Sequence, residues 1–582
     1  MAGRRNKASD RARAAPQRPP AHAQTQTRTR TRTQTRAGAI GGRNVGLLLA
    51  FCLVAFVLYA PALDGPFVSD DAHYVVHNPY VSDLTPGRAL ELFDPRGEAV
   101  RLVENYAPVH VLLHALQWKL FGPDVRGHHV VNVMLHVVVS LLLVVGLRRA
   151  GLAAPLAAFG GAFFLVHPAN VEAVAWISQL KTTASLALAI GALLLRPRRP
   201  GLALLVFTLG LLAKPMAALA LPVAVVQVAV ARRRDEDGAE RPRLVREAGW
   251  LGGWIVVFAA FAVAELAAFL WASAPLQAEA GDWGGRAQMA ASLVARYAWM
   301  ALTGLGVSFF HSPARPATWL DPLVLAGLAI TALVAARAVF AFRARRTEAA
   351  WWVWAGAAFV PVSQFLAFRH PLADHYLYPI LPGLIGGLLL ALSESRAAGV
   401  WLAAKRARIS AAVLAVAVLV ALGVHAYERA RLWSSPALLL ADSAANYPDG
   451  IQAHLQRVRR AANAGQPEQI ATELRGALAL GFDRFEQILA DPATSAYGAH
   501  PDVQAVLRDM AARWVERYAG HDDLSQAEWL SLGFAHQVRD ERDAARRAFE
   551  RALARGGPLD DNVRTALREL GDGPGSPGEP GP

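Results

Sequence analysis

Long apolar runs separated by short polar breaks fill most of the first 427 residues. A helix needs about 20 apolar residues to cross a bilayer. Eight runs reach or approach that length: 45–63, 129–147, 176–195, 249–272, 322–341, 351–368, 376–392 and 409–426. Three shorter apolar runs, 152–167, 201–213 and 216–231, lie among them. The pattern predicts an all-α, polytopic transmembrane protein with about eleven spans.

Two apolar stretches need a separate interpretation. Residues 292–310, "SLVARYAWMALTGLGVSFF", would be a twelfth span, but a span here would invert the sidedness of every later loop. We interpret them as a re-entrant segment or a helix in the membrane interface. Trp351, Trp352 and Trp354 are interpreted as an interfacial aromatic belt.

After about residue 427 the apolar runs shorten and the charges become frequent, which predicts a soluble helical domain over 428–570. The spacing of Trp529, Gly533, Ala545 and Phe549 is similar to a tetratricopeptide repeat (TPR), with small residues where two helices cross. Residues 452–480 are interpreted as a degenerate earlier copy. An unrelated helical hairpin is the alternative, and the final segment 571–582 is expected to be a flexible tail.

The net charge of +13 is concentrated at the start of the chain. Residues 1–43 hold eleven Lys or Arg against one acid, Asp10, in a low-complexity sequence. We expect a disordered, basic cytoplasmic tail that touches anionic lipid. No aromatic residues alternate with these arginines, so nucleic acid is not an expected partner.

Basic residues also fix the expected orientation, because they mark the cytoplasmic side of a membrane protein. Clusters occur at 148–149, 196–199, 232–234, 343–346 and 405–408. They predict a multi-pass protein of the cell (inner) membrane, with its N-terminus in the cytoplasm and its C-terminal domain outside. The single cysteine, Cys52, excludes an intrachain disulfide and a cysteine metal site.

Under this topology, ionisable residues gather at the outer side. Asp70 and Asp71 follow the first span, and His167 and Glu172 lie at the outer end of a later one. A solvated turn or helix cap is the plainer interpretation of the aspartate pair.

Two lysines favour a functional interpretation of this side, because a lysine within apolar sequence is costly and is usually paired or functional. Lys181 and Lys214 both stand among apolar residues. Such cations suit the phosphate of a lipid donor, while the aspartates suit the acceptance of a proton from a hydroxyl. Lys214, next to Pro215, could instead extend from a broken span toward the interface.

Several blocks now stand in order: "FVSDDAHYVVHNPYV", "LVHPANVEAVAWISQLKTTASLAL", "LAKPMAALALPV" and "HYLYPILPG". Over roughly residues 45–427 the chain resembles the tetratricopeptide-repeat protein O-mannosyltransferases and their bacterial relatives, within the GT-C superfamily. The resemblance implies a GT-C membrane fold of about eleven spans, followed by a TPR-like domain. It also implies an inverting glycosyltransferase that uses a polyprenyl-phosphate sugar, with mannose as the candidate sugar.

The resemblance also implies roles for individual residues. Asp70 and Asp71 would serve as base and in acceptor binding, without a ranking between them. The expected substrate-binding residues are Glu172, His167, Lys181, Lys214, His375, Tyr376, Asn78 and Tyr106.

Partners and alternatives follow from the same resemblance. The expected partners are the lipid-linked sugar donor, membrane lipid and a polypeptide acceptor or partner protein held by the TPR-like domain. No metal ligand set is identified, and the need for a divalent metal stays open. Two alternatives to protein glycosylation also stay open: sugar transfer to a lipid or surface polysaccharide, and a non-catalytic TPR membrane scaffold.

Overall fold

The structure, a computed structural model, describes residues 44–103, 105–272, 283–365, 370–395, 404–522, 524–557 and 559–571. The expected tail 1–43 lies outside these residues, and so does the expected tail 571–582 except for Gly571, the last residue of a helix. Two compact units divide the chain, Met1–Leu53 and Val54–Pro582. In the first unit the described residues, 44–53, are helical, and the account below concerns the second unit.

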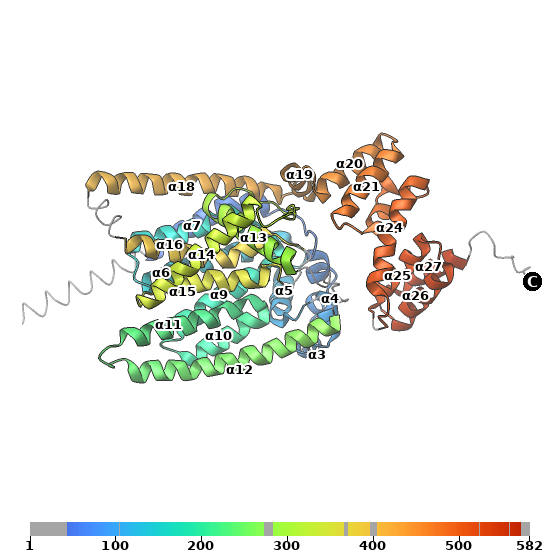
Figure 1. The fold of residues 1–582 in the computed structure, drawn as a ribbon. Helices are drawn as coiled ribbons and strands as arrows, with labels where there is room; N and C mark the ends of the chain where they lie inside the picture. Colours follow the sequence, from blue (N-terminus) through green and yellow to red (C-terminus); the bar gives the residue numbers. More distant parts are fainter. Residues whose placement is uncertain are drawn as a thin grey trace, which may run out of the picture. The chain divides into compact units, whose positions relative to one another are not determined.

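The described part is all-helical, as predicted (Figure 1). The membrane-type region begins with short elements: η1 Ala60–Ala62, η2 Ala72–Val76, α2 Pro79–Ser82, α3 Pro86–Glu91, α4 Glu98–Val103 and α5 Pro108–Phe121. The following helices are α6 Val125–Arg149, α7 Ala154–Leu165, η3 Pro168–Asn170, α8 Val171–Ala175, η4 Ile177–Gln179, α9 Leu180–Leu195, α10 Pro200–Ala213, η5 Pro215–Leu219 and α11 Ala220–Arg234. The region continues with α12 Arg241–Ala272, α13 Trp283–Thr303, α14 Pro322–Arg343, α15 Glu348–Phe359, η6 Val360–Val362, α16 Asp374–Ser393 and α18 Lys405–Leu432.

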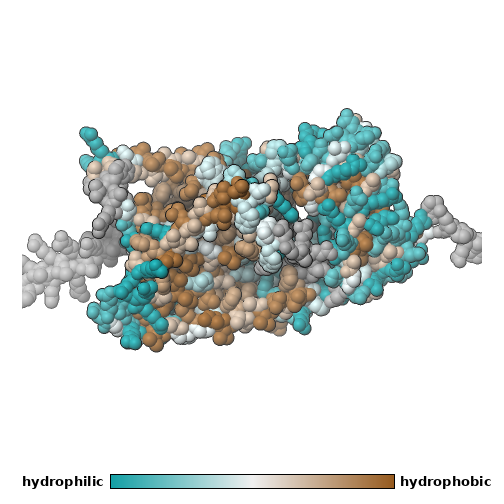
Figure 2. Space-filling model, in the orientation of Figure 1, coloured by the Kyte–Doolittle hydropathy of each residue, from teal (hydrophilic) through white to brown (hydrophobic). Residues whose placement is uncertain are grey.

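Eight helices in the described residues are long and apolar enough to cross a membrane, and the bent pair α7–α8 makes nine. Helices also occupy the other two expected positions, but α10 has 14 residues and α15 has 12. At about 1.5 Å per residue, they are shorter than a bilayer core of about 30 Å. The predicted number of about eleven spans is therefore not confirmed, because the described residues hold eight or nine candidates. Figure 2 shows apolar residues over much of this bundle.

Helix α13, which covers most of the stretch expected not to span, is not among the span candidates. Its Tyr297 hydroxyl lies 3.3 Å from the carbonyl oxygen of Ala373, just before α16. Its Ala301 carbonyl contacts the ring of His167, just before η3. Helix α13 therefore ends beside the start of α16 and the break between α7 and α8.

The prediction of an interfacial tryptophan belt is wrong. Trp351, Trp352 and Trp354 are buried, and α15 packs along α16. A Cβ added to Gly386 would lie 2.2 Å from the Trp351 ring, so the glycine makes room for the indole. The indoles are buried because α16 offers small residues to pack against, which a hydropathy pattern does not show.

Three of the loops that carry basic clusters, those at 148–149, 232–234 and 343–346, meet at one end of the bundle. Thr347 contacts Ala150, Arg345 pairs with Glu236, and Arg346 pairs with Glu394 at the end of α16. Helix α16 runs from this end of the bundle to the opposite end. Glu394 follows the last residue of α16 at this end, and His375 lies in the first turn of α16 at the other. The candidate site lies around that first turn.

The C-terminal region continues from α18 as helical hairpins. Its helices are α19 Pro436–Asn446, α20 Ile451–Asn463, α21 Pro467–Ala479, α22 Phe485–Ala490, α23 Pro492–Ser495, α24 Pro501–Tyr518, α25 Gln526–Val538, α26 Arg542–Arg555 and α27 Asp560–Gly571. Helices α25 and α26 cross at Gly533, where an added Cβ would lie 2.2 Å from the Phe549 ring. Helix α18 continues to Leu432, past the domain boundary expected at 427.

Candidate functional site

The Asp70–Asp71 loop is held in place by the second aspartate. Asp71 is fully buried, and its carboxylate accepts hydrogen bonds from the backbone N–H groups of Val68 (2.9 Å) and Ser178 (2.8 Å). Burial raises the pKa of Asp71 to about 7, although the two backbone donors act in the opposite direction. Ser69, just before the pair, has a φ of +50°, which is uncommon outside glycine. Asp71 thus fastens the first loop to the segment before α9.

Asp70 has a different environment. Its side chain is half-buried and accepts a hydrogen bond from the Ser69 hydroxyl at 3.1 Å. Its charge acts on His375 and Tyr376 in the first turn of α16. Asp70 therefore faces the same space as the start of α16.

The two lysines face this space from α9 and from the break before η5. Lys181 Nζ lies 4.0 Å from the centre of the Tyr74 ring, and Lys214 Nζ donates to Thr182 Oγ1 at 2.7 Å. Both charges act on His375. Among the residues that the structure describes, neither lysine forms an ion pair with a carboxylate. Two cations without an acidic partner are suited to bind an anion.

Glu172 closes the site on the side of α16. Its Oε2 accepts the backbone N–H of His375 at 2.7 Å, and its Oε1 lies 3.0 Å from His375 Nδ1. The first N–H groups of a helix have no partner within the helix and carry a partial positive charge. Buried Glu172 therefore caps α16 from another helix and fixes the position of His375.

Three of the expected binding residues contact backbone groups outside this space. His167 Nδ1 accepts the Ala169 N–H, and its Nε2 lies 3.2 Å from the Ala301 carbonyl oxygen. The Asn78 side chain caps α2 by accepting the Tyr80 N–H. The Tyr106 hydroxyl donates to the Phe93 carbonyl at 3.0 Å. The structure thus brings together Asp70, Asp71, Glu172, Lys181, Lys214, His375 and Tyr376, and gives the other three residues partners elsewhere.

Trp176 is a member of the site that the sequence did not identify. Its Nε1–H donates to the Val68 carbonyl at 3.3 Å, next to the loop that holds the aspartates. Its ring lies 6.0 Å from His375 and 6.2 Å from Trp433, centre to centre. The only sequence signal was its place in the same block as Glu172, between the acid and Lys181.

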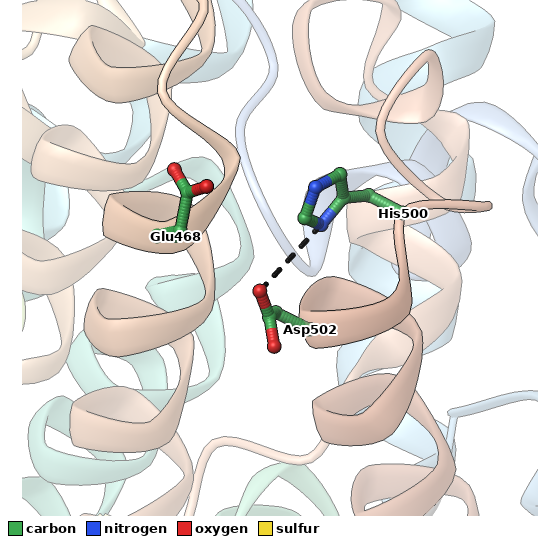
Figure 3. Close-up of side chains that lie close together, drawn as sticks. All are labelled: Glu468, His500 and Asp502. Atoms are coloured by element: carbon green, nitrogen blue, oxygen red, sulfur yellow. Dashed lines mark ion pairs between the residues drawn. The ribbon is translucent and has the colours of Figure 1, made fainter.

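Among the described residues, no residue of this site belongs to a cluster of His, Cys, Asp or Glu that could hold a metal ion. The group that the geometry allows lies on α21 and α24: Glu468, His500 and Asp502, with ligand atoms within 4.8 Å of one another (Figure 3). His500 Nδ1 lies 3.9 Å from Asp502 Oδ2, and both acids are exposed. Exposed acids of this kind do not by themselves indicate a metal.

Comparison with known proteins gives partial similarity. The chain is 33% identical over 147 residues to a protein O-mannosyl-transferase of Caenorhabditis elegans, which covers 24% of this chain and 21% of the relative. It is 37% identical over 138 residues to Protein O-mannosyl-transferase Tmtc1 of Drosophila melanogaster, covering 22% and 15%. The human TMTC4 protein is 34% identical over 143 residues, covering 21% and 19%.

These matches span about a fifth of the length of the curated relatives. No family model matches the chain. No solved structure matches it either. Homologues of this membrane-type helical chain are thus named protein O-mannosyl-transferases.

Proposed function

We propose that the chain is a GT-C-type membrane glycosyltransferase that moves a sugar from a polyprenyl-phosphate donor to a protein hydroxyl. The relatives' names make mannose the first candidate sugar. One observation carries the proposal. A half-buried carboxylate, Asp70, faces the same space as Lys181 and Lys214, beside the start of α16, and in the described residues neither lysine pairs with an acid.

In the proposed reaction, the lysines bind the phosphate that links the sugar to the lipid. Asp70 accepts the proton of the acceptor hydroxyl as its oxygen forms a bond to the anomeric carbon. The bond from that carbon to the phosphate oxygen breaks, and the polyprenyl phosphate leaves with the electron pair. Lys181 and Lys214 stabilise the negative charge on the leaving phosphate. Attack on the face opposite the phosphate inverts the anomeric configuration. Asp71 keeps the loop in position and does not take the proton.

We also propose the sidedness of the reaction. The basic loops gather at one end of α16 and the candidate site at the other. Basic loops favour the cytoplasmic side, so the site and the TPR-like helices would face away from the cytoplasm. The helical hairpins of that region would hold the polypeptide acceptor.

A complementation experiment tests the proposal. Cells that lack the chain are supplied with wild type, Asp70→Asn or Asp83→Asn, and their glycoproteins, glycolipids and surface polysaccharides are compared. Asp83 is the control because it lies in the same loop region, pairs with Arg88 and is 75% exposed.

We expect wild type and Asp83→Asn to restore a protein-linked sugar that Asp70→Asn does not restore. If the cells with Asp70→Asn lacked sugar only on glycolipid or polysaccharide, the acceptor would be a hydroxyl of one of those molecules and not of a protein. Full restoration of the glycans by Asp70→Asn would refute the proposed enzymatic function and favour a non-catalytic scaffold.

A further inference from the structure

A buried chain of hydrogen bonds connects the C-terminal region to the first turn of α16. His311, in the loop between α13 and α14, has a fully buried side chain. Its Nε2 lies 2.7 Å from Asp374 Oδ1, and its Nδ1 lies 2.7 Å from the Tyr447 hydroxyl. Tyr447 directly follows α19. Three residues from separate parts of the chain therefore form one continuous contact.

The chemistry of the three groups gives this contact a direction. We assign the proton to Nε2, because an ionised Asp374 can only accept a hydrogen bond from it. In a neutral imidazole, Nδ1 then accepts the hydrogen of Tyr447. The other carboxylate oxygen of Asp374 accepts the Ser308 N–H at 3.0 Å. Asp374 is thereby fixed at both oxygens.

The start of the C-terminal region holds the His311 loop at further points. The Ser443 hydroxyl oxygen of α19 accepts the Phe310 N–H at 3.1 Å. Arg429, near the end of α18, pairs with Asp442 of α19 at 2.6 Å. These contacts fix α19 against α18 and against the loop, so Tyr447 is part of an ordered arrangement.

The same helical turn belongs to the candidate transfer site. Asp374 is the first residue of α16, and the next residue, His375, is the one held by Glu172. Glu172 and Asp374 line one small cavity together with Arg429 and Trp433 of the α18 end. A movement of Asp374 would therefore shift His375 relative to both lysines.

We propose that His311 and Tyr447 are positioning residues of the transfer site, so that the site includes the start of the C-terminal region. Tyr447 holds His311, His311 holds Asp374, and Asp374 sets the first turn of α16. This inference rests on the proposed function, and it adds residues that act on the site through Asp374.

Substitutions in the full-length protein can separate positioning from packing. The amide nitrogen of glutamine reaches the place of Nε2, so His311→Gln keeps a donor to Asp374. Asparagine reaches only the place of Nδ1, so His311→Asn loses that donor. Tyr447→Phe removes only the hydrogen bond between the Tyr447 hydroxyl and His311 Nδ1. Tyr497→Phe is the matched control, since the Tyr497 hydroxyl donates to the Ala462 carbonyl within the C-terminal helices.

Two readouts are measured in lipid nanodiscs: the rate of sugar transfer, and the affinity for a short-chain polyprenyl phosphate. A hydrogen bond to a charged group contributes enough for a roughly 10- to 100-fold effect. We therefore expect His311→Asn to lose about 10- to 100-fold in both readouts and His311→Gln to stay within about 5-fold of wild type. Tyr447→Phe should lose about 3- to 10-fold, and Tyr497→Phe should lose nothing.

Equal effects of His311→Gln and His311→Asn would overturn the inference, and so would equal effects of Tyr447→Phe and Tyr497→Phe. A wild-type protein that binds the lipid phosphate but transfers no sugar would refute the proposed function alone. The affinity series would still decide on the positioning role.

Discussion

The cap that Glu172 places on α16 gives a prediction with a magnitude. In Glu172→Gln the amide oxygen can still accept the His375 N–H, and the amide nitrogen can face His375 Nδ1. The geometry is retained and the charge is lost. A hydrogen bond to a charged group contributes about 1.5–3 kcal/mol and a neutral one about 0.5–1.5 kcal/mol. The expected cost is therefore about 1–2 kcal/mol, or roughly a 5- to 30-fold lower transfer rate.

Glu172→Ala removes both contacts, at 2.7 and 3.0 Å, and leaves a buried helix N-terminus without its cap. The expected cost is about 3–5 kcal/mol, or roughly a 100- to 5,000-fold loss. Initial rates of transfer over a range of donor concentrations measure both variants, with thermal melting as a control for folding.

Two results would refute this reasoning. If Glu172→Ala kept the wild-type rate, the cap would not matter for the site. If Glu172→Gln were as inactive as Glu172→Ala, the charge of Glu172 would act directly in the chemistry, and the carboxylate would not be a positioning group.

Three further predictions concern the cations, the first loop and pH. Lys181→Gln should weaken binding of a polyprenyl phosphate roughly 10-fold in nanodisc titrations, whereas an unchanged affinity would exclude Lys181 from the phosphate site. Gly65→Ala should lower the melting temperature, because its Cβ would lie 2.3 Å from the Trp433 carbonyl oxygen, while Gly252→Ala, with nothing within 4 Å, should not. The folded protein keeps a proton on Asp71 that the unfolded chain loses above about pH 4. Wild-type stability relative to Asp71→Asn should therefore fall as pH rises from about 4 to 7, and equal pH slopes in melting experiments would contradict the raised pKa.

Apolar run length made the membrane region predictable. Each run of suitable length contains a helix, because an uncharged segment can satisfy its backbone groups within a bilayer only by forming one. The sequence also singled out Lys181 and Lys214 as candidate binding residues, because a charged side chain within an apolar run is costly and is usually paired or functional. Length also explains where the prediction fell short: α10 and α15 are helices, but neither is long enough to count as a span.

Contacts between distant residues could not be read from the sequence. The backbone donor to Asp71 from Ser178 is 107 residues away, so the sequence could not distinguish the roles of the two aspartates. His311 and Tyr447 lie outside every block that carried the resemblance, and only the fold brings them to Asp374. His167 stood in one of the blocks that carried the resemblance, yet its ring nitrogens contact backbone groups.

The central claim is that Lys181 and Lys214 bind a lipid phosphate next to Asp70. The most direct measurement compares the affinity of wild type, Lys214→Gln and Lys119→Gln for a polyprenyl phosphate and for the matching polyprenol in nanodiscs. Lys119 is an exposed lysine on α5. We predict that wild type and Lys119→Gln prefer the phosphate, and that Lys214→Gln loses roughly 10- to 100-fold of its affinity for the phosphate alone. Equal affinities of all three proteins for the phosphate, or no preference for phosphate over polyprenol, would contradict the claim.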